Sequence, residues 1–142
     1  MKYINDSFKV KTGKRLEVID ITNDVEKIVR ESGIKEGVLI VFEPHTTAAI
    51  TINENDPELF EDLINIYTKI APIEQRYQHN LKYEGVPGEQ NAHAHIISSL
   101  IKPSVIVPIT NGRTQLGTWQ RILFIEMDGP RTRNVYVKVI GE

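Results

Sequence analysis

The sequence contains no cysteine and no long apolar run, and each absence removes a class of protein. Without cysteine, the chain has neither disulfides nor thiolate metal sites. No apolar stretch approaches the roughly 20 residues of a membrane-spanning helix, so we expect no membrane partner. Residues 1–6 lack the apolar region of a secretory signal, and we therefore expect a cytoplasmic protein.

Neither sign of charge dominates, since the formal net charge is -2 and the isoelectric point is about 6.1. A balanced surface offers no general attraction for nucleic acid, so we expect no nucleic-acid partner. The 40% hydrophobic and 25% charged residues are typical of a soluble globular protein. A length of 142 residues suits one domain, and we expect a single domain over residues 1–142.

Several familiar catalytic motifs are also missing. The chain has no Walker loop, no G-x-G-x-x-G, no G-x-S-x-G and no H-E-x-x-H. Nucleotide-binding, α/β-hydrolase and zincin functions therefore lose support.

Apolar periodicity predicts several strands. Residues 8–11 and 16–21 alternate apolar and polar side chains around Thr12–Lys14, which predicts a hairpin with one buried face. The continuous apolar run at 38–42 is expected for a strand covered on both faces. Further strands are expected at residues 48–53, 105–109, 122–127 and 134–140.

Two helices are predicted from their boundary residues. Asn23 begins the first, with Glu26 as its capping-box partner, and Gly33 fits the left-handed position after its last turn. Asp56 and Pro57 begin the second, because Asp is a strong N-cap and Pro is favoured at the first helical position.

A third, short helix is expected at residues 92–101, after an irregular segment at 73–89. The sum is about seven strands, mostly paired with their sequence neighbours, and about three helices. This composition indicates an α+β fold rather than a doubly wound parallel sheet.

Only four histidines occur, and three of them, His79, His93 and His95, lie in one stretch of the chain. The fourth, His45, follows Pro44 at the end of an apolar strand. Histidine readily binds transition metals and moves protons near neutral pH, so the grouping indicates a site. Histidines from three segments can converge on Zn²⁺ and leave one position open. The alternatives are a backbone-bonded turn histidine at position 45 and a solvated histidine at position 79.

The spacing of His93 and His95 depends on local conformation. Residues two apart share a face on a strand but point to nearly opposite sides of a helix. A two-histidine metal clasp therefore requires an extended segment. The spacing by itself favours one surface or capping histidine and one buried, hydrogen-bonded histidine.

Three groups of polar residues could assist a histidine site. Glu54 is a candidate base or partner of a metal ligand, although favourable electrostatics at the first helical turn is the preferred explanation. Thr118 and Gln120 offer directed hydrogen bonds in a Gly-containing turn that also suits a tight hairpin. Arg131 can bind a carboxylate or phosphate through two hydrogen bonds.

The order of these motifs resembles the YjbQ-like family, also called the secondary thiamine-phosphate synthase family. The likeness covers nearly the whole chain. It rests on His45-Thr46-Thr47-Ala48, Thr51-Ile52-Asn53-Glu54-Asn55, Asp56-Pro57, Asp62-Leu63, His79, Asn91, Ala94-His95-Ile96, Val107-Pro108, Leu116-Gly117-Thr118-Trp119-Gln120 and Asp128-Gly129-Pro130-Arg131.

The resemblance implies a compact, sandwich-like α+β fold that assembles as a homotrimer. It also implies a site built from His45, His79 and His95. Four further polar residues are implied nearby, namely Asn53, Glu54, Asn91 and Gln120. The family usually has a residue other than histidine at position 93, which makes His93 a weaker candidate than His95.

The family name implies a weak thiamine-phosphate synthase activity, which joins a pyrimidine diphosphate to a thiazole phosphate. We expect a divalent metal on the three histidines, with Zn²⁺ the natural ion for imidazole and Mg²⁺ an alternative if a diphosphate leaves. The expected catalytic residues are Glu54, His79, Asn91 and Gln120. The expected substrate-binding residues are Asn53, Arg113, Thr118 and Arg131.

These expectations describe a cytoplasmic enzyme that acts on a small metabolite, including phosphorylated ones. The competing function is a non-catalytic trimer that stores or senses a metal or a metabolite. Metal analysis combined with turnover assays would separate the two.

Overall fold

Two antiparallel sheets form the body of the protein, and the computed structural model describes all residues from 1 to 142. The larger sheet contains β1 (Lys2–Lys11), β3 (Gly37–Phe42), β5 (Ser104–Thr110), β6 (Arg113–Thr114) and β8 (Thr132–Gly141). The smaller sheet contains β2 (Glu17–Asp20), β4 (Ala48–Asn53) and β7 (Arg121–Glu126). Their strand orders are β1-β8-β3-β5-β6 and β2-β7-β4.

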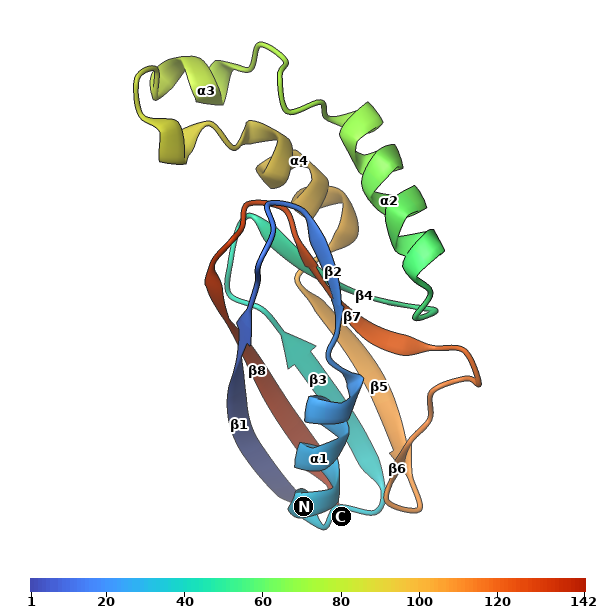
Figure 1. Ribbon diagram of the computed structural model, residues 1–142. Coiled ribbons are helices and arrows are strands. Elements are labelled where there is room, and N and C mark those ends of the chain that lie inside the picture. The colour runs from blue at the N-terminus through green and yellow to red at the C-terminus, as the bar shows by residue number, and fades with distance from the viewer.

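Four α-helices and one 3-10 turn complete the fold. They are α1 (Thr22–Ser32), α2 (Pro57–Ile70), α3 (Gln78–Lys82), η1 (Pro87–Glu89) and α4 (Ala92–Ile101). Figure 1 shows α1 beside the sheets near both chain termini, whereas α2, α3 and α4 lie together at the opposite end. No helix in the structure is both long and apolar enough to cross a bilayer.

The smaller sheet is covered on both faces. One face packs against the larger sheet and α1 in a core of 17 buried residues. The other face packs against α2 and α4 in a core of 7 buried residues. This explains the sequence of β7, where the four residues Ile122–Ile125 are all buried.

The larger sheet is covered on one face only. In β3, Leu39 and Val41 are fully buried, whereas Val38 and Phe42 are 38% and 39% exposed. The prediction that 38–42 is covered on both faces is therefore wrong within a single chain. The apolar outer face remains available for contact with another surface.

The predicted α+β, sandwich-like fold is confirmed, but the predicted hairpin at its start is wrong. β1 pairs with β8 over its whole length, and β2 pairs with β7 in the other sheet. Thr12 leaves the larger sheet with its N–H bonded to the Arg131 carbonyl at 2.9 Å. Only β5 and β6 pair as sequence neighbours, so most pairing joins distant parts of the chain.

The helix boundaries follow the sequence signals closely. Asp56 caps α2 through its side chain, and Gly33 ends α1 with φ at 70°. The capping box of α1 is absent, since the helix begins at Thr22 and Glu26 instead accepts a hydrogen bond from Thr114. The structure adds α3 inside the segment that was predicted to be irregular.

Candidate functional site

His45 lies in the turn between β3 and β4 and is fixed by two backbone contacts. Its Nε2 accepts a hydrogen bond from the Asn134 N–H of β8 at 2.9 Å. Its own backbone N–H donates to Glu43 Oε2 at 2.8 Å. Burial lowers the pKa of His45, and the nearby Arg133 guanidinium lowers it further. The ring is therefore held neutral near physiological pH.

His79 of α3 and His95 of α4 face each other. Their ring centroids are 4.7 Å apart in an edge-to-face arrangement. His79 Nε2 lies 3.0 Å from Asn91 Oδ1. Burial lowers the pKa of His95, followed by the effect of the neighbouring His79. The structure therefore brings together two of the three predicted metal ligands and one predicted catalytic amide.

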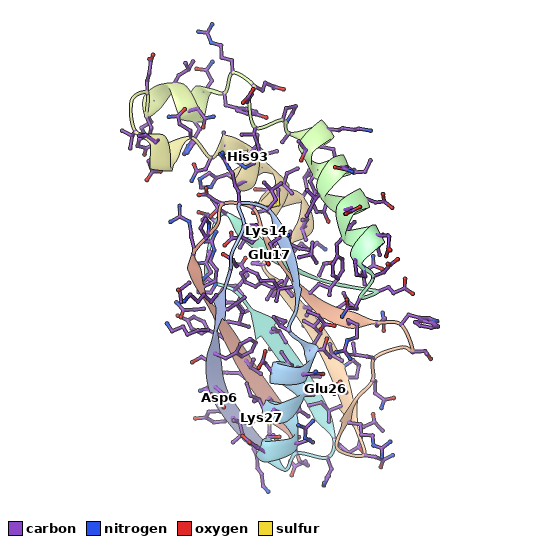
Figure 2. The ribbon with its side chains drawn as sticks, viewed as in Figure 1. Asp6, Lys14, Glu17, Glu26, Lys27 and His93 are labelled. Carbon is purple, nitrogen blue, oxygen red and sulfur yellow. The ribbon has the colours of Figure 1, made fainter.

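His93 points away from these rings because residues 92–101 are helical. It is 1% exposed, and its Nε2 lies 3.1 Å from the Met127 carbonyl oxygen. Figure 2 locates His93 on α4. His95, in contrast, lines two cavities at the surface.

Asn91 connects His79 to a charged pair in the turn between β7 and β8. Its Nδ2 donates to Asp128 Oδ2 at 2.8 Å, and Arg131 Nη2 donates to the same oxygen at 2.9 Å. Arg131 Nε also donates to the Asp128 carbonyl oxygen at 2.7 Å. Asn91 is 6% exposed, whereas the Arg131 side chain at the other end of these contacts is 46% exposed.

Two adjacent cavities, of about 330 and 320 Å³, are both lined by His45, Thr46 and His95. We call them together the histidine pocket. Apart from Pro44, every residue that lines the first cavity is polar, and Arg131 is among them. The pocket therefore suits a small polar ligand better than an apolar one.

A buried ionic cluster supports the pocket from beneath. Arg133 pairs with Glu126, and both are almost fully buried. Thr12 Oγ1 donates to Glu126 Oε1 at 2.8 Å, and Arg133 Nη2 donates to Thr47 Oγ1 at 2.9 Å. These bonds satisfy charges that would otherwise be costly to bury.

Glu43 is a buried acid that the sequence analysis missed. It is 1% exposed, and burial raises its pKa to about 8. Its Oε1 has no hydrogen-bond partner, nor has the buried Ser98 Oγ, and both residues line the second cavity. The available signal was a single carboxyl residue placed between an apolar run and Pro44-His45. Asp128 was also missed as a site residue, although it belongs to the Asp128-Gly129-Pro130-Arg131 motif of the family resemblance.

Four predicted site residues lie at the other end of the smaller sheet. Asn53 closes β4 and pairs with Arg121, whereas Ala48 pairs with Glu126 beside His45. Five strand steps of roughly 3.3 Å separate these ends by about 17 Å. We call them the histidine end and the far end. The far end holds Asn53, Glu54, Thr118 and Gln120.

The far-end side chains bond mainly to their own loops. Asn53 Oδ1 accepts the Glu54 N–H at 2.8 Å, and Gln120 Oε1 accepts the Gly117 N–H at 2.7 Å. Thr118 is exposed. Within one chain, these residues do not reach the histidine pocket.

Arg113 is also distant from the histidines. It lies on β6, beside the end of β3 where Gly37 pairs with Ile109, whereas His45 follows Phe42 at the opposite end of that strand. Arg113 and Glu26 line a separate cavity of about 310 Å³. Of the two predicted anion-binding arginines, only Arg131 lies at the histidine pocket.

The predicted zinc ligands do not form a complete three-residue site within one chain. No group of three His, Cys, Asp or Glu side chains is arranged to hold a metal ion. His79 and His95 are adjacent, but the Asn134 N–H already occupies the Nε2 lone pair of His45. A metal held by the two adjacent rings would need further ligands from water, substrate or another chain.

Comparisons with known proteins agree with the fold and with the family resemblance. A family model described as UPF0047 protein YjbQ-like matches residues 6–142. The chain belongs to this family.

The sequences of two relatives align with nearly the whole chain. A UPF0047 protein of Archaeoglobus fulgidus is 44% identical over 131 residues, which cover 92% of this chain and 97% of the relative. The UPF0047 protein YugU of Bacillus subtilis is 43% identical over 136 residues, which cover 95% and 98%.

Two solved structures share the fold. A YbjQ-like protein of Sulfolobus solfataricus superposes with a TM-score of 0.93 at 37% identity, covering 99% of both chains. A YjbQ/UPF0047 family protein of Clostridium acetobutylicum superposes with a TM-score of 0.87 at 46% identity, covering 95% of this chain and 99% of the other.

Proposed function

We propose that the chain is a small-metabolite enzyme that binds an anionic substrate in the histidine pocket and moves a proton there. One observation carries the proposal: His45 and His95 line the same polar cavity as Arg131. A guanidinium can hold a carboxylate or phosphate, and neutral imidazoles can accept or donate a proton. Lowered pKa values keep both rings in that neutral form.

Among the predicted catalytic residues, His79 and Asn91 are best placed for this role. Asn91 lines the cavity and bonds the His79 ring, which in turn lies against His95. Glu54 and Gln120 keep their predicted roles only if the far end of another chain completes the pocket. Asn53 and Thr118 share that condition.

We propose that thiamine-phosphate synthase activity is slow and secondary. The chain has no Gly-rich loop that leads into a helix N-terminus, which is the usual cradle for a diphosphate. We expect kcat/KM well below the roughly 10⁴–10⁸ M⁻¹s⁻¹ of efficient enzymes for the pyrimidine diphosphate and thiazole phosphate pair. Steady-state kinetics within that range would overturn this view.

The proposal also includes a divalent metal ion, for which Zn²⁺ is favoured over Mg²⁺. His79 and His95 would contribute imidazole nitrogens, for which Zn²⁺ has a stronger preference than Mg²⁺ has. Such a metal would polarise an oxygen of the substrate or of water. Elemental analysis of the protein as purified, compared with its His95→Ala variant, tests this. Equal metal content in the two proteins would contradict it.

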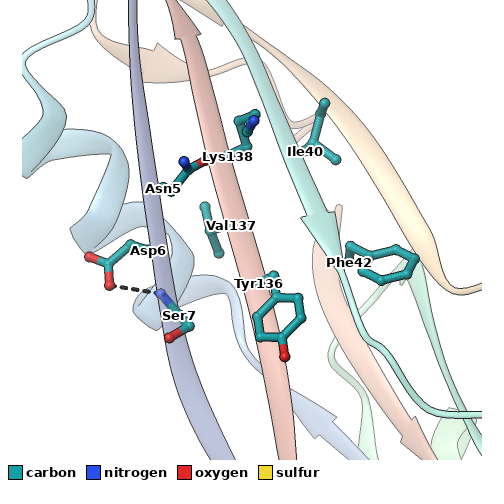
Figure 3. Close-up of a pocket in the computed structure, with 8 residues that line it drawn as sticks. All are labelled: Asn5, Asp6, Ser7, Ile40, Phe42, Tyr136, Val137 and Lys138. Carbon is teal, nitrogen blue, oxygen red and sulfur yellow. Dashed lines mark hydrogen bonds between the residues drawn. The ribbon is translucent and has the colours of Figure 1, made fainter.

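We propose that the chain assembles as a cytoplasmic homotrimer through the outer face of the larger sheet. Phe42 of β3 and Tyr136 of β8 are paired neighbours there, and both are partly exposed. Figure 3 shows them side by side with Ile40 in a hollow of about 510 Å³. On β5, Ile106 is 66% exposed. An uncovered apolar face of this kind is typical of an interface.

Sedimentation of the purified protein tests this assembly. We expect a closed trimer, in which each subunit repeats one heterologous contact around the axis. Ile106→Glu should shift the protein towards monomers because it adds a charge to the apolar face. A stable wild-type monomer at micromolar concentration would contradict the proposal.

A further inference from the structure

The hydrogen bonds of His45 determine which of its nitrogens carries a proton. The Asn134 N–H can only donate, and it points at Nε2 over 2.9 Å. Nε2 must therefore be the unprotonated nitrogen. In the neutral ring, the proton then resides on Nδ1. Free histidine prefers the other tautomer, so the β8 backbone selects the less favoured form.

His79 is held in the opposite tautomer, and the Asn91 amide sets it. The Asp128 carboxylate can only accept, so the Asn91 amide must turn its Nδ2 towards it. The Asn91 Oδ1 then faces His79 Nε2 at 3.0 Å and must accept a hydrogen bond from it. His79 therefore carries its proton on Nε2, which leaves Nδ1 bare.

Asp128 is well placed to enforce this orientation. Arg131 donates to the same Oδ2 that receives the Asn91 amide, which keeps that oxygen an acceptor. The Asp128 side chain is 12% exposed, and its backbone N–H donates to Glu126 Oε2 at 3.1 Å. Two donors therefore hold Oδ2 of the carboxylate, and a third bond holds the Asp128 backbone.

We infer that His45, which lines the histidine pocket, and His79, which lies against the pocket residue His95, are held in opposite tautomers, with Asp128 as the positioning residue for His79 through Asn91. His45 can then offer a ligand only an N–H, which suits the oxygen of a phosphate or carboxylate. His79 offers a bare Nδ1, which can accept a proton or bind a metal. His45 accordingly leaves the set of metal ligands, and His79 and His95 remain in it.

The ligand roles rest on the proposed function of the pocket, but the tautomers do not. They can be read without any ligand from the nitrogen NMR spectrum of the histidine rings, because protonated and bare ring nitrogens resonate far apart. The spectrum is recorded on the metal-free full chain at slightly alkaline pH, above the ordinary pKa of an imidazole. His45→Asn and His79→Asn assign the signals.

We expect His45 to show a protonated Nδ1 and His79 a protonated Nε2. The same tautomer in both rings would overturn the inference. In Asp128→Ala, Asn91 is free to turn, so His79 should lose its single tautomer while His45 keeps its own. The unchanged His45 signal shows that the variant is folded. An unchanged His79 tautomer would overturn the positioning role of Asp128.

Zinc titration of the same variants tests the ligand assignment with the metal alone. Asparagine at position 45 can still donate near the place of Nδ1, so His45→Asn should bind Zn²⁺ within about threefold of wild type. His79→Asn and Asp128→Ala should bind it about 10–100-fold more weakly. A loss in His45→Asn as large as in His79→Asn would overturn the exclusion of His45. If the wild type binds no Zn²⁺, the proposed metal fails, while the ring spectra still decide the tautomers.

Discussion

The two ends of the smaller sheet differ in how their polar side chains are held. At the histidine end, Asn91 and Arg133 bond side chains from distant segments and are almost fully buried. At the far end, Asn53 and Gln120 bond their own loops and are exposed. Catalysis and binding need groups that are fixed before the ligand arrives. Of the predicted site residues, only those at the histidine end meet that requirement within one chain.

The largest expected difference between the ends concerns stability. Arg133→Met leaves the fully buried Glu126 without its partner and should cost about 3–5 kcal/mol in free energy of unfolding. At the far end, Arg121→Met breaks a more exposed pair with Asp20 and should cost about 1 kcal/mol or less. Urea unfolding of both variants measures the difference. Equal losses would show that burial does not distinguish the two ends.

The next effect concerns turnover. Any activity that depends on proton transfer in the pocket should fall by about 100-fold in His79→Ala. Glu54→Gln should produce a smaller loss, which would require that the far end of a neighbouring chain reaches the pocket. Steady-state kinetics on both variants measures the two effects. Unchanged kinetics in both would place the chemistry outside the histidine pocket.

The pH dependence of stability should reveal the buried Glu43. Its folded-state pKa of about 8 lies above its ordinary value of 4.5, mainly because burial disfavours the charged form. The contribution of protonated Glu43 to the free energy of unfolding is therefore complete below pH 4.5, and it is lost as the pH rises through about 8. Glu43→Gln cannot ionise and should be about 1–3 kcal/mol more stable than wild type at the alkaline end.

Unfolding free energies measured across this pH range test the Glu43 prediction. The wild type and Glu43→Gln should differ most at the alkaline end, and their difference should become constant once the pH falls below 4.5. Parallel curves over the whole range would show that Glu43 ionises as easily in the fold as in the unfolded chain.

The smallest effect is expected for the far-end loop. Gln120→Ala removes the acceptor of the Gly117 N–H on an exposed turn and should cost about 1 kcal/mol or less. The ring signals of His45 and His79 should not move, since the ends lie about 17 Å apart. A changed tautomer at either ring would show that the two ends are coupled.

Local sequence signals predicted much of this fold. Asp56 and Gly33 marked helix boundaries correctly because capping depends on residues within one turn. The short helix at 92–101 was predicted at its observed limits. Strand partners were not predictable in this way. β1 pairs with a strand more than 100 residues away, and nothing in residues 8–21 distinguishes that pairing from a hairpin.

The same contrast between local and distant signals applies to the candidate site. The types and order of the residues identified His79 and His95, and their rings do meet. Glu43 and Asp128 were missed because their importance comes from burial and from partners on other strands. Arg113 was grouped with Arg131 by residue type alone, and the sheet places it at the opposite end.

The most direct test of the central claim is to map where a small anionic ligand binds. Amide NMR spectra of the full-length protein, titrated with thiazole phosphate, report this residue by residue. We predict shifts at His45, Asn91 and Arg131. Shifts confined to the far-end residues Asn53 and Gln120 would contradict the assignment of the histidine pocket as the functional site.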